Sequence, residues 1–263
     1  MNRVVVGCCG FPMSRSRYYG LFEAVELQET FYNPLNPESL KRCRREAPEG
    51  FKFTMKGWQA ITHPPESPTW RRSKFRPPGG CGDRYGHLRP TKEVMEAWEL
   101  VREAAEALGA TYVVLQLPPS FTYSRENLTN VKDFLSATCD ATFRIGIELR
   151  GDWHGHDEEL RSVLEGFSNV VHVTDPFRWF PPAKQSGNCY FRLHGIGGRE
   201  VNYRYKYSAE DLVKLKEMLE GLKPPSEVYV MFNNVHMRED ALNFMKLIHR
   251  HHNPSSQLSN SRV

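Results

Sequence analysis

The sequence contains no long hydrophobic run. Its apolar stretches are short and interrupted by charged residues, so none offers the about 20 consecutive apolar residues of a membrane-spanning helix. No apolar segment with a cleavage site follows Met1 either, because Asn2 and Arg3 lead directly into a short β-branched run. We therefore expect a cytoplasmic protein that does not contact a membrane.

The six cysteines include no C-x-x-C pair. Cys8 and Cys9 are adjacent and cannot easily bridge each other, and a chain of 263 residues does not need a disulfide framework to fold. We expect reduced thiols that pack in the interior. The alternative is that Cys8, Cys9 and a loop thiol such as Cys81 hold a metal or an iron–sulfur cluster.

The H-E-x-x-H spacing of zinc hydrolases is also missing. Glu26, Glu148, Asp175, His172 and His194 carry side chains that can ligate a divalent cation, so a metal remains an alternative, and the cofactor is left unassigned. The net charge of +4 is far from that of a histone-like chain. It is compatible with an anionic partner without requiring one.

Short runs of β-branched and aromatic residues alternate with helical patterns along the chain. The expected strands are residues 4–8, 23–27, 51–56, 112–117, 143–149, 170–174, 189–194 and 228–232. The expected helices are 37–46, 91–108, 127–136, 157–165, 208–222 and 238–251, the first opened by an Asn-Pro-Glu cap and the second closed by glycine. This alternation predicts an α/β fold, a single (β/α)₈ barrel of the TIM type.

Two connections are longer than the ideal unit allows. Residues 58–90 form a Pro/Gly/Arg-rich insertion, and residues 175–187 show no convincing helix. Long loops of this kind are usually functional or disordered. We predict one barrel domain over residues 1–252, with long βα loops, and a disordered tail over residues 253–263.

Polar side chains collect near the C-terminal end of nearly every predicted strand, where buried barrel strands are usually aliphatic. Catalytic groups of such barrels lie at this end. The period of two places Glu148 with Arg150, and Arg192 with His194, on shared faces. The strand-end set comprises Glu26, Gln28, Lys56, Gln116, Glu148, Arg150, Asp175, Arg192, His194, Asn233 and Asn234.

Two interpretations of this set are open. In the first it is a catalytic centre: Lys56, Arg150 and Arg192 hold phosphate oxygens. Glu26 and Glu148 act as general base or hold the cation, and His194 acts as general acid or ligand. In the second, the charges form an internal ion-pair network that closes the top of the barrel.

Three loop segments interleave cations with aromatic residues: WRRSKFR at 70–76, FRWF at 177–180 and YRYKY at 203–207. This mixture suits single-stranded DNA or RNA, since cations contact phosphates and rings stack on bases. The alternative is that the cations lie over packed aromatic rings. The binding candidates outside the strand ends are His63, Arg71, Arg72, Arg76, Trp153, Trp179, Tyr203 and Tyr205.

These observations favour a nucleic-acid-binding protein or a phosphodiester-directed, nuclease-like hydrolase. The first alternative is a small-molecule enzyme of the xylose-isomerase-like type that acts on a sugar or a phosphosugar, so that its partner is a small molecule that can contain phosphate, with Trp58 and Trp153 as platforms for the sugar ring. The second alternative is a binding protein without catalysis, in which the strand-end charges are structural.

The same residues carry a family resemblance that covers nearly the whole chain. The landmarks are GCCGF at 7–11, VELQETFY at 25–32, FKFTMK at 51–56, ITH at 61–63, LQLPPSF at 115–121, ELR at 148–150, RLHG at 192–195 and FNN at 232–234. Together they resemble the YecE-like family, a domain-of-unknown-function family of barrels, although that family usually has Thr-Ser-Gly-Trp where this chain has Cys8-Cys9-Gly10-Phe11. The resemblance implies a fold similar to the endonuclease-four and xylose-isomerase-like barrels, and by that analogy a DNA-processing role.

Overall fold

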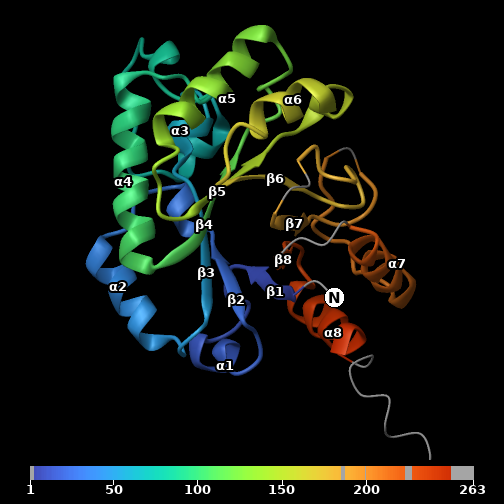
Figure 1. Cartoon of the computed structure of the whole chain (residues 1–263). Coiled ribbons are helices and arrows are strands. Elements are labelled where there is room, and N and C mark those ends of the chain that lie inside the picture. Colours follow the sequence, from blue (N-terminus) through green and yellow to red (C-terminus); the bar gives the residue numbers. More distant parts are fainter. Residues whose placement is uncertain (1–2, 185–186, 199, 223–226, 250–263) are drawn as a thin grey trace, which may run out of the picture.

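The computed structural model describes residues 3–184, 187–198, 200–222 and 227–249. Eight strands, each parallel to its neighbours, close into one barrel because β1 pairs with both β2 and β8 (Figure 1). The strands are β1 (Arg3–Cys9), β2 (Ala24–Leu27), β3 (Lys52–Lys56), β4 (Ala110–Gln116), β5 (Arg144–Glu148), β6 (Val170–Thr174), β7 (Cys189–Leu193) and β8 (Glu227–Phe232). The predicted barrel is confirmed.

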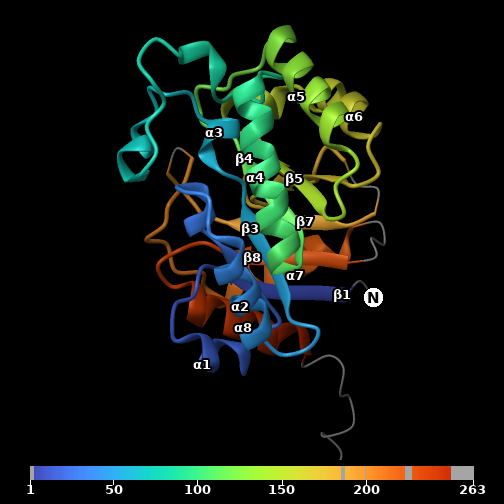
Figure 2. The same cartoon turned by 90° about the vertical axis from the view of Figure 1, so that its left-hand side faces the viewer.

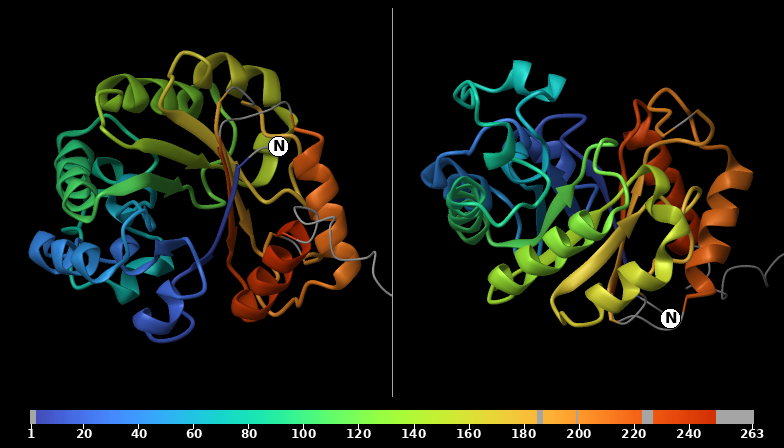
Figure 3. Two further views of the ribbon diagram at one scale, coloured as in Figure 1. Left: turned by 60° about the horizontal axis from the view of Figure 1, so that its bottom comes forward. Right: turned by 90° about the horizontal axis from the view of Figure 1, so that it is seen from above.

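Helices surround the barrel on its outside (Figure 3). They are α1 (Arg15–Tyr19), α2 (Pro37–Glu46), α3 (Gln59–Thr62), α4 (Lys92–Leu108), α5 (Arg125–Thr138), α6 (Asp157–Leu164), α7 (Ala209–Glu220) and α8 (Met237–His249). Within the described residues, each predicted helix is found within two residues of its expected ends. The short helices α1 and α3 were not predicted, because one turn leaves too few residues for a 3.6-residue period.

The helix ends follow from local chemistry. The Asn36 side chain accepts a hydrogen bond from the Glu38 amide at 2.8 Å, with Pro37 in the first turn of α2. Thr91 caps α4 in the same way, and α4 ends at Gly109, whose φ of 63° lies in the left-handed region that glycine adopts without strain. No helix within the described ranges is both long and apolar enough to cross a bilayer.

The barrel interior changes character from one end to the other. Its lower and middle layers are apolar and aromatic: the rings of Tyr190 and Tyr229 stack with centroids 5.5 Å apart, and Tyr112 packs edge-on against Tyr229. Buried Val5, Val114, Val171, Val173 and Met231 fill the remaining space. The buried charged side chains Glu26, Glu148 and Arg192 belong to the layer nearest the C-terminal ends of the strands.

The long insertion before α4 is ordered. Besides α3 it contains two 3₁₀ turns, η2 (Pro68–Arg72) and η3 (Gly82–Arg84). Edge contacts among Trp58, Trp70, Phe75 and Tyr85 hold it together. In Figure 2 this teal segment projects on the side of the strands' C-terminal ends.

The connection from β6 to β7 contains no helix in its described part, as the sequence predicted. Lys184 closes it by donating to the carbonyl oxygens of Val170, at 2.8 Å, and Phe167. The tail at 253–263 lies outside the described residues.

Candidate functional site

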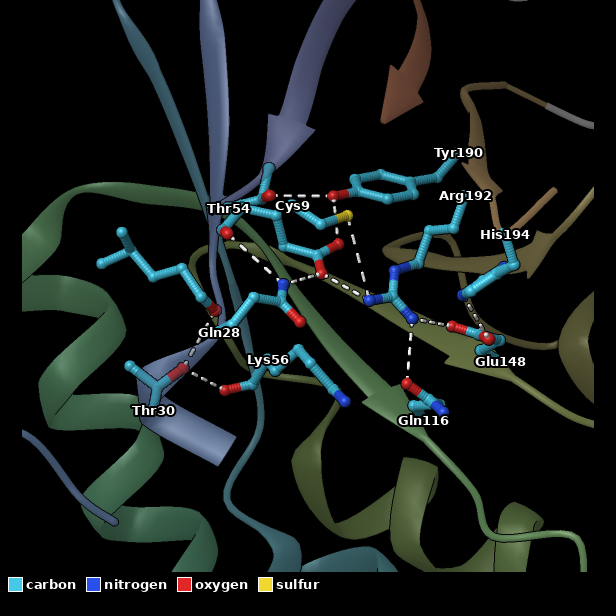
Figure 4. Close-up of polar contacts among 12 residues, drawn as sticks. Cys9, Gln28, Thr30, Thr54, Lys56, Gln116, Glu148, Tyr190, Arg192 and His194 are labelled. Carbon is cyan, nitrogen blue, oxygen red and sulfur yellow. Dashed lines mark hydrogen bonds and ion pairs between the residues drawn. The ribbon is translucent and has the colours of Figure 1, made fainter. Parts of the chain in front are cut away.

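Five predicted side chains lie buried on the interior face at the C-terminal end of the barrel: Glu26, Lys56, Glu148, Arg192 and His194. Figure 4 labels the last four of them. Their positions follow from the period of two, which turns alternate residues of each strand inward. His172 instead faces the helices. Its Nδ1 accepts a hydrogen bond from the Ala183 amide at 3.0 Å, and its ring packs on Trp179. His172 therefore cannot ligate a cation at the barrel mouth.

Arg192 organises the floor of the site. Its guanidinium, which is fully buried, donates from Nη2 to Glu26 Oε1 at 2.8 Å and from Nη1 to Gln116 Oε1 at 3.0 Å. Nη1 also donates to Glu148 Oε2, and the Cys9 sulfur lies 3.9 Å from Nη2. We call Glu26, Arg192 and Glu148 the floor network. It joins the three strands β2, β5 and β7 across the barrel.

Glu26 has no exposed surface and its oxygens are shared among protein donors. Tyr190 donates its hydroxyl proton to Oε2 at 2.7 Å, and Gln28 donates to Oε1 alongside Arg192. A second hydrogen bond joins the Tyr190 hydroxyl to the Thr54 hydroxyl at 2.8 Å. Three donors satisfy this buried carboxylate, so it is built into the structure in the way that buried charges require.

Glu148 lies at the edge of the floor network. Burial alone would raise its pKa, but the positive charges of Arg192, His194 and Arg150 outweigh that effect and hold the pKa below its usual value. His194 lies between two carboxylates, with Nε2 3.6 Å from Glu148 Oε1 and Nδ1 3.7 Å from Asp175 Oδ2. Its backbone amide also donates to Asp175, at 2.9 Å. At 3.6 Å the contact with Glu148 is longer than a hydrogen bond, so His194 Nε2 has no hydrogen-bond partner among the described residues.

The turn after β7 closes over this histidine. Gly195 has a φ of 89°, and a Cβ there would lie 2.1 Å from the Asn202 carbonyl oxygen, so only glycine fits. The Asn202 amide donates to the His194 carbonyl at 2.9 Å. The turn brings the Tyr203 ring to 5.9 Å from that of His194.

A cleft of about 940 Å³ opens above the floor network. Three cations from different loops and strands line it, Lys56, Arg72 and Arg150, against one lining carboxylate, Glu66. Rings and amides complete the wall, so the cleft is cationic but also offers stacking faces and hydrogen-bond partners: Phe31, Tyr32, Tyr203, Gln28, Gln116, Asn233 and Asn234.

Lys56 differs from the other cations of the site. Its side chain is 9% exposed, and its Nζ lies 3.9 Å from the centroid of the Phe31 ring. Within the described chain its ammonium has neither a hydrogen bond nor an ion pair, and Figure 4 shows it apart from the Arg192 contacts. Burial, reinforced by the charge of Arg192, lowers the pKa of Lys56 to about 7.

The other lining groups are held in place. Arg72 lies over the Tyr32 ring at 4.0 Å and donates to its hydroxyl at 2.6 Å. Arg150 donates to Glu148 Oε1 at 3.2 Å. His63 packs edge-on against Phe31, and burial together with the charge of Lys56 lowers the pKa of His63 to about 3. Its imidazole is therefore neutral at physiological pH.

A smaller chamber of about 400 Å³ adjoins the cleft on the other side of Arg150, which lines both. Glu148, Asp175, Glu200 and His194 face it. The buried His194 Nε2 and Thr174 Oγ1, which also line it, have no hydrogen-bond partner in the described protein. This chamber has room for a polar group beside the histidine.

Several predicted binding residues lie elsewhere, and their assignment is corrected. Trp153 is fully buried, stacks on Phe121 and donates its indole proton to the Phe121 carbonyl at 2.6 Å, so it cannot support a sugar ring. Trp58 is likewise packed in the insertion. Tyr205 donates to Asp211 at 2.6 Å in the cap of α7 and does not line the cleft.

The predicted basic–aromatic groove is only partly assembled. Arg72 and Tyr203 line the cleft, whereas the exposed Arg71 and Arg76 do not. Trp179 is 7% exposed, lines the smaller chamber and donates to Asp157 at 2.8 Å.

Asn233 lies in the wall of the cleft, and so does Asn234, whose amide also bonds Asp240 and the Tyr205 carbonyl. Asp175 lines the chamber.

The donor set does not fit a metal centre. Among the described residues, no group of three or more His, Cys, Asp and Glu side chains is placed to hold a cation. The carboxylates of the floor are already shared by Arg192, Tyr190 and Gln28. Cys8, Cys9 and Cys81 do not converge either: Cys8 contacts the Met237 carbonyl, Cys9 faces Arg192, and Cys81 contacts the Gly79 carbonyl. No catalytic step is therefore derived through a metal.

Some residues of the site were not predicted from the sequence. Tyr190 lies two residues before Arg192, and the same alternation that selected Arg192 could have identified it as inward-facing. Tyr32 and Glu66 lie in loops, and Glu200 follows a turn, so no periodic pattern marked them. Only the folded chain brings them to the strand ends.

A family model described as "protein of unknown function DUF72" matches residues 14–262 of the chain. The chain belongs to the DUF72 family. This is the family that the landmark motifs resemble, and its solved members show the same fold. A DUF72 family protein from Enterococcus faecalis V583 is 20% identical with a TM-score of 0.70, covering 94% of this chain and 98% of its own. One from Thermotoga maritima MSB8 is 25% identical with a TM-score of 0.65, covering 94% and 99%.

The likeness extends to another group of barrels. A xylose isomerase domain containing protein from Salmonella typhimurium LT2 is 13% identical with a TM-score of 0.56, covering 95% of each chain. At this identity the likeness shows a shared fold and nothing about activity. No curated protein matches the chain.

Proposed function

We propose that this DUF72 protein is an enzyme whose cleft binds a phosphate-bearing substrate. The proposal depends on one observation: Lys56, Arg72 and Arg150 converge on a cleft that is lined by a single carboxylate, Glu66. Arg72 is the freest anion ligand, because its contact is with the neutral Tyr32 and its guanidinium is exposed. Arg150 reaches the same space while paired with Glu148. Arg192 is fully buried in the floor network and shares Glu148 with Arg150.

The site also supplies groups for proton transfer. His194 and Glu148 adjoin the cleft through Arg150, and the neutral His63 lines it. A small phosphorylated molecule, rather than a long strand, suits a cleft in which Gln28, Gln116 and Asn233 can bond hydroxyl groups. The fold shared with xylose isomerase domain proteins supports this choice by analogy only.

Calorimetry tests the proposal with two matched pairs. We expect ribose 5-phosphate to bind and ribose to bind at least tenfold more weakly, since a charge-assisted contact contributes about 1.5–3 kcal/mol. Arg72→Ala should weaken phosphate binding by about tenfold, whereas Arg71→Ala, one residue away and outside the cleft, should not. Equal effects of the two substitutions, or equal binding of the two sugars, would overturn the proposal.

A single-stranded nucleic acid is the second candidate, because Arg71, Arg72, Lys74 and Arg76 are exposed beside the cleft and Tyr203 is 42% exposed within it. A fluorescence titration of a labelled oligonucleotide should then show micromolar binding that weakens with salt. Changing Arg71, Arg72 and Arg76 together to Ala should flatten the salt slope by about two units, at about 0.7 per phosphate contact. If no binding is found at low salt, the small phosphate ester remains as the single candidate ligand.

A further inference from the structure

Lys56 occupies a fixed position at the centre of the barrel mouth. It ends β3, and its carbonyl oxygen accepts a hydrogen bond from the Thr30 hydroxyl at 2.6 Å, which ties the strand end to η1 (Glu29–Phe31). The side chain then runs along the Phe31 ring and ends in the cleft. A ligand in the cleft meets this amine from a constant direction, as covalent chemistry requires.

The surroundings of Lys56 do not supply a counter-ion. The nearest carboxylates, Glu26 and Glu148, are bonded to Arg192 within the floor network. The charges of Arg192 and Arg150 repel a proton on Nζ. A lysine that is desolvated beside other cations is the usual arrangement of an amine that acts as a nucleophile.

The consequence is a large population of free amine. With a pKa of about 7, Lys56 is close to half deprotonated at neutral pH. Its free-amine fraction is then roughly 10³-fold above that of an ordinary lysine, whose pKa is about 10.4. Arg72 and Arg150 keep their charge at any physiological pH, so anion binding and nucleophilic attack fall to different side chains.

We propose that Lys56 forms an imine with the carbonyl carbon of the substrate, which makes the substrate a phosphorylated aldehyde or ketone. The proposal deepens the phosphate-ester function and rests on it for the phosphate group. The Nζ lone pair forms the C–N bond while the carbonyl π electrons move to oxygen. Both amine protons then pass to that oxygen, which leaves as water, so that a C=N bond remains and no oxidant or reductant is consumed.

The rest of the cleft fits this chemistry. His63 lines the same cleft, and its neutral imidazole can offer a hydrogen bond to the carbonyl oxygen without adding charge beside the amine. Gln28, Gln116 and Asn233 offer hydrogen bonds to the hydroxyl groups of an open-chain sugar. Among the described residues that line the cleft, Glu66 is the one carboxylate that could stabilise the protonated amine.

Reductive trapping tests the imine. The full chain is incubated with dihydroxyacetone phosphate and sodium cyanoborohydride at neutral pH, and digested peptides are examined by mass spectrometry. We expect the adduct on the peptide that contains Lys56 at least tenfold above exposed Lys41 and Lys92, consistent with its larger free-amine fraction. Lys56→Met should remove that adduct without lowering the melting temperature, which shows that the variant is folded. Labelling of Lys56 no stronger than that of Lys41 would overturn the proposal.

Two controls separate the imine from the phosphate function. Dihydroxyacetone, without the phosphate, should label Lys56 about tenfold less at equal concentration if Arg72 and Arg150 hold the phosphate. Calorimetry with inorganic phosphate reports anion binding without any carbonyl. Phosphate binding without a Lys56 adduct refutes the imine and leaves the proposed function standing. Equal labelling by both ketones, without phosphate binding, supports the amine chemistry and refutes the phosphate site.

Discussion

The floor network and the mouth of the barrel, where Lys56 and Arg72 line the cleft, differ in how their charged side chains are paired. In the floor network, Glu26 and Glu148 each accept a hydrogen bond from Arg192, and all three side chains are almost completely buried. At the mouth, Lys56 is nearly as buried but has no ion-pair partner among the described residues, and Arg72 contacts the neutral Tyr32 phenol. The two layers are adjacent in space.

This contrast separates structure from ligand binding. A buried charge that is fully paired has its partners supplied by the protein and gains nothing further from a ligand. A buried charge without a partner costs stability, and folded proteins retain such costs mainly at functional sites. The interpretation of the strand-end charges as an ion-pair network therefore describes the floor, and the interpretation as a binding site suits the mouth.

Removing the centre of the floor network should have the largest effect. Arg192→Met leaves Glu26 buried without a positive partner and leaves Glu148 with Arg150 as its remaining arginine partner, so we expect a loss of about 3–5 kcal/mol in the free energy of unfolding. Urea titration measures it. The triple variant Glu26→Leu, Arg192→Met, Glu148→Leu removes all three charges and should recover most of the loss. A triple variant as unstable as Arg192→Met would show that packing, rather than charge, holds the floor.

An intermediate effect is expected from Glu148→Gln, because Arg192 keeps its contact with Glu26. We expect a loss of about 1.5–3 kcal/mol at pH 7, the range for a hydrogen bond to a charged group. The folded pKa of Glu148 lies below its usual value of 4.5, so its contribution is complete above pH 4.5 and is lost as pH falls through the folded value. The difference between wild type and variant should therefore shrink below pH 4.5. A difference that stays constant down to pH 3 would contradict the pairing.

The sequence predicted the barrel well because its evidence is local. Strand alternation and helix caps such as Asn36 and Thr91 depend on neighbours a few residues away, and the structure bears them out. Strand parity also placed Glu26, Glu148 and Arg192 together at one end. It could not show which charges pair, because Glu26 and Arg192 are 166 positions apart in the chain and their contact depends on strands that face each other across the barrel.

The loops were predicted less well for a related reason. Composition marks residues 70–76 as basic and aromatic. Arg71 and Arg72 belong to the same 3₁₀ turn, yet of the two Arg72 lines the cleft and Arg71 does not. The indole of Trp153 is occupied by the carbonyl of Phe121, a partner that no spacing rule identifies. Side-chain direction in irregular segments is set by tertiary contacts, and these are visible only in the folded chain.

The smallest change in stability, and the opposite sign, is expected at the mouth. An ordinary lysine holds its proton up to a pKa of 10.5, whereas folded Lys56 releases it near pH 7. Between these values the unfolded chain binds more protons than the folded one, so stability rises with pH in this window.

Lys56→Met removes that linkage. The variant should be more stable than wild type at pH 7, and the advantage should vanish as pH approaches 10.5. The fall in pKa from 10.5 to about 7 sets a ceiling of about 4 kcal/mol on this gain, at about 1.4 kcal/mol per pKa unit. The lost cation–π contact with Phe31 opposes the gain at every pH where the amine is charged, so the net difference should lie well below that ceiling. Urea midpoints at intervals from pH 7 to 10 measure the difference, and Lys52→Met, at the opposite end of β3, is the matched control. A variant less stable than wild type by a constant amount would mean that the amine is charged and satisfied, and the distinction between floor and mouth would fail at Lys56.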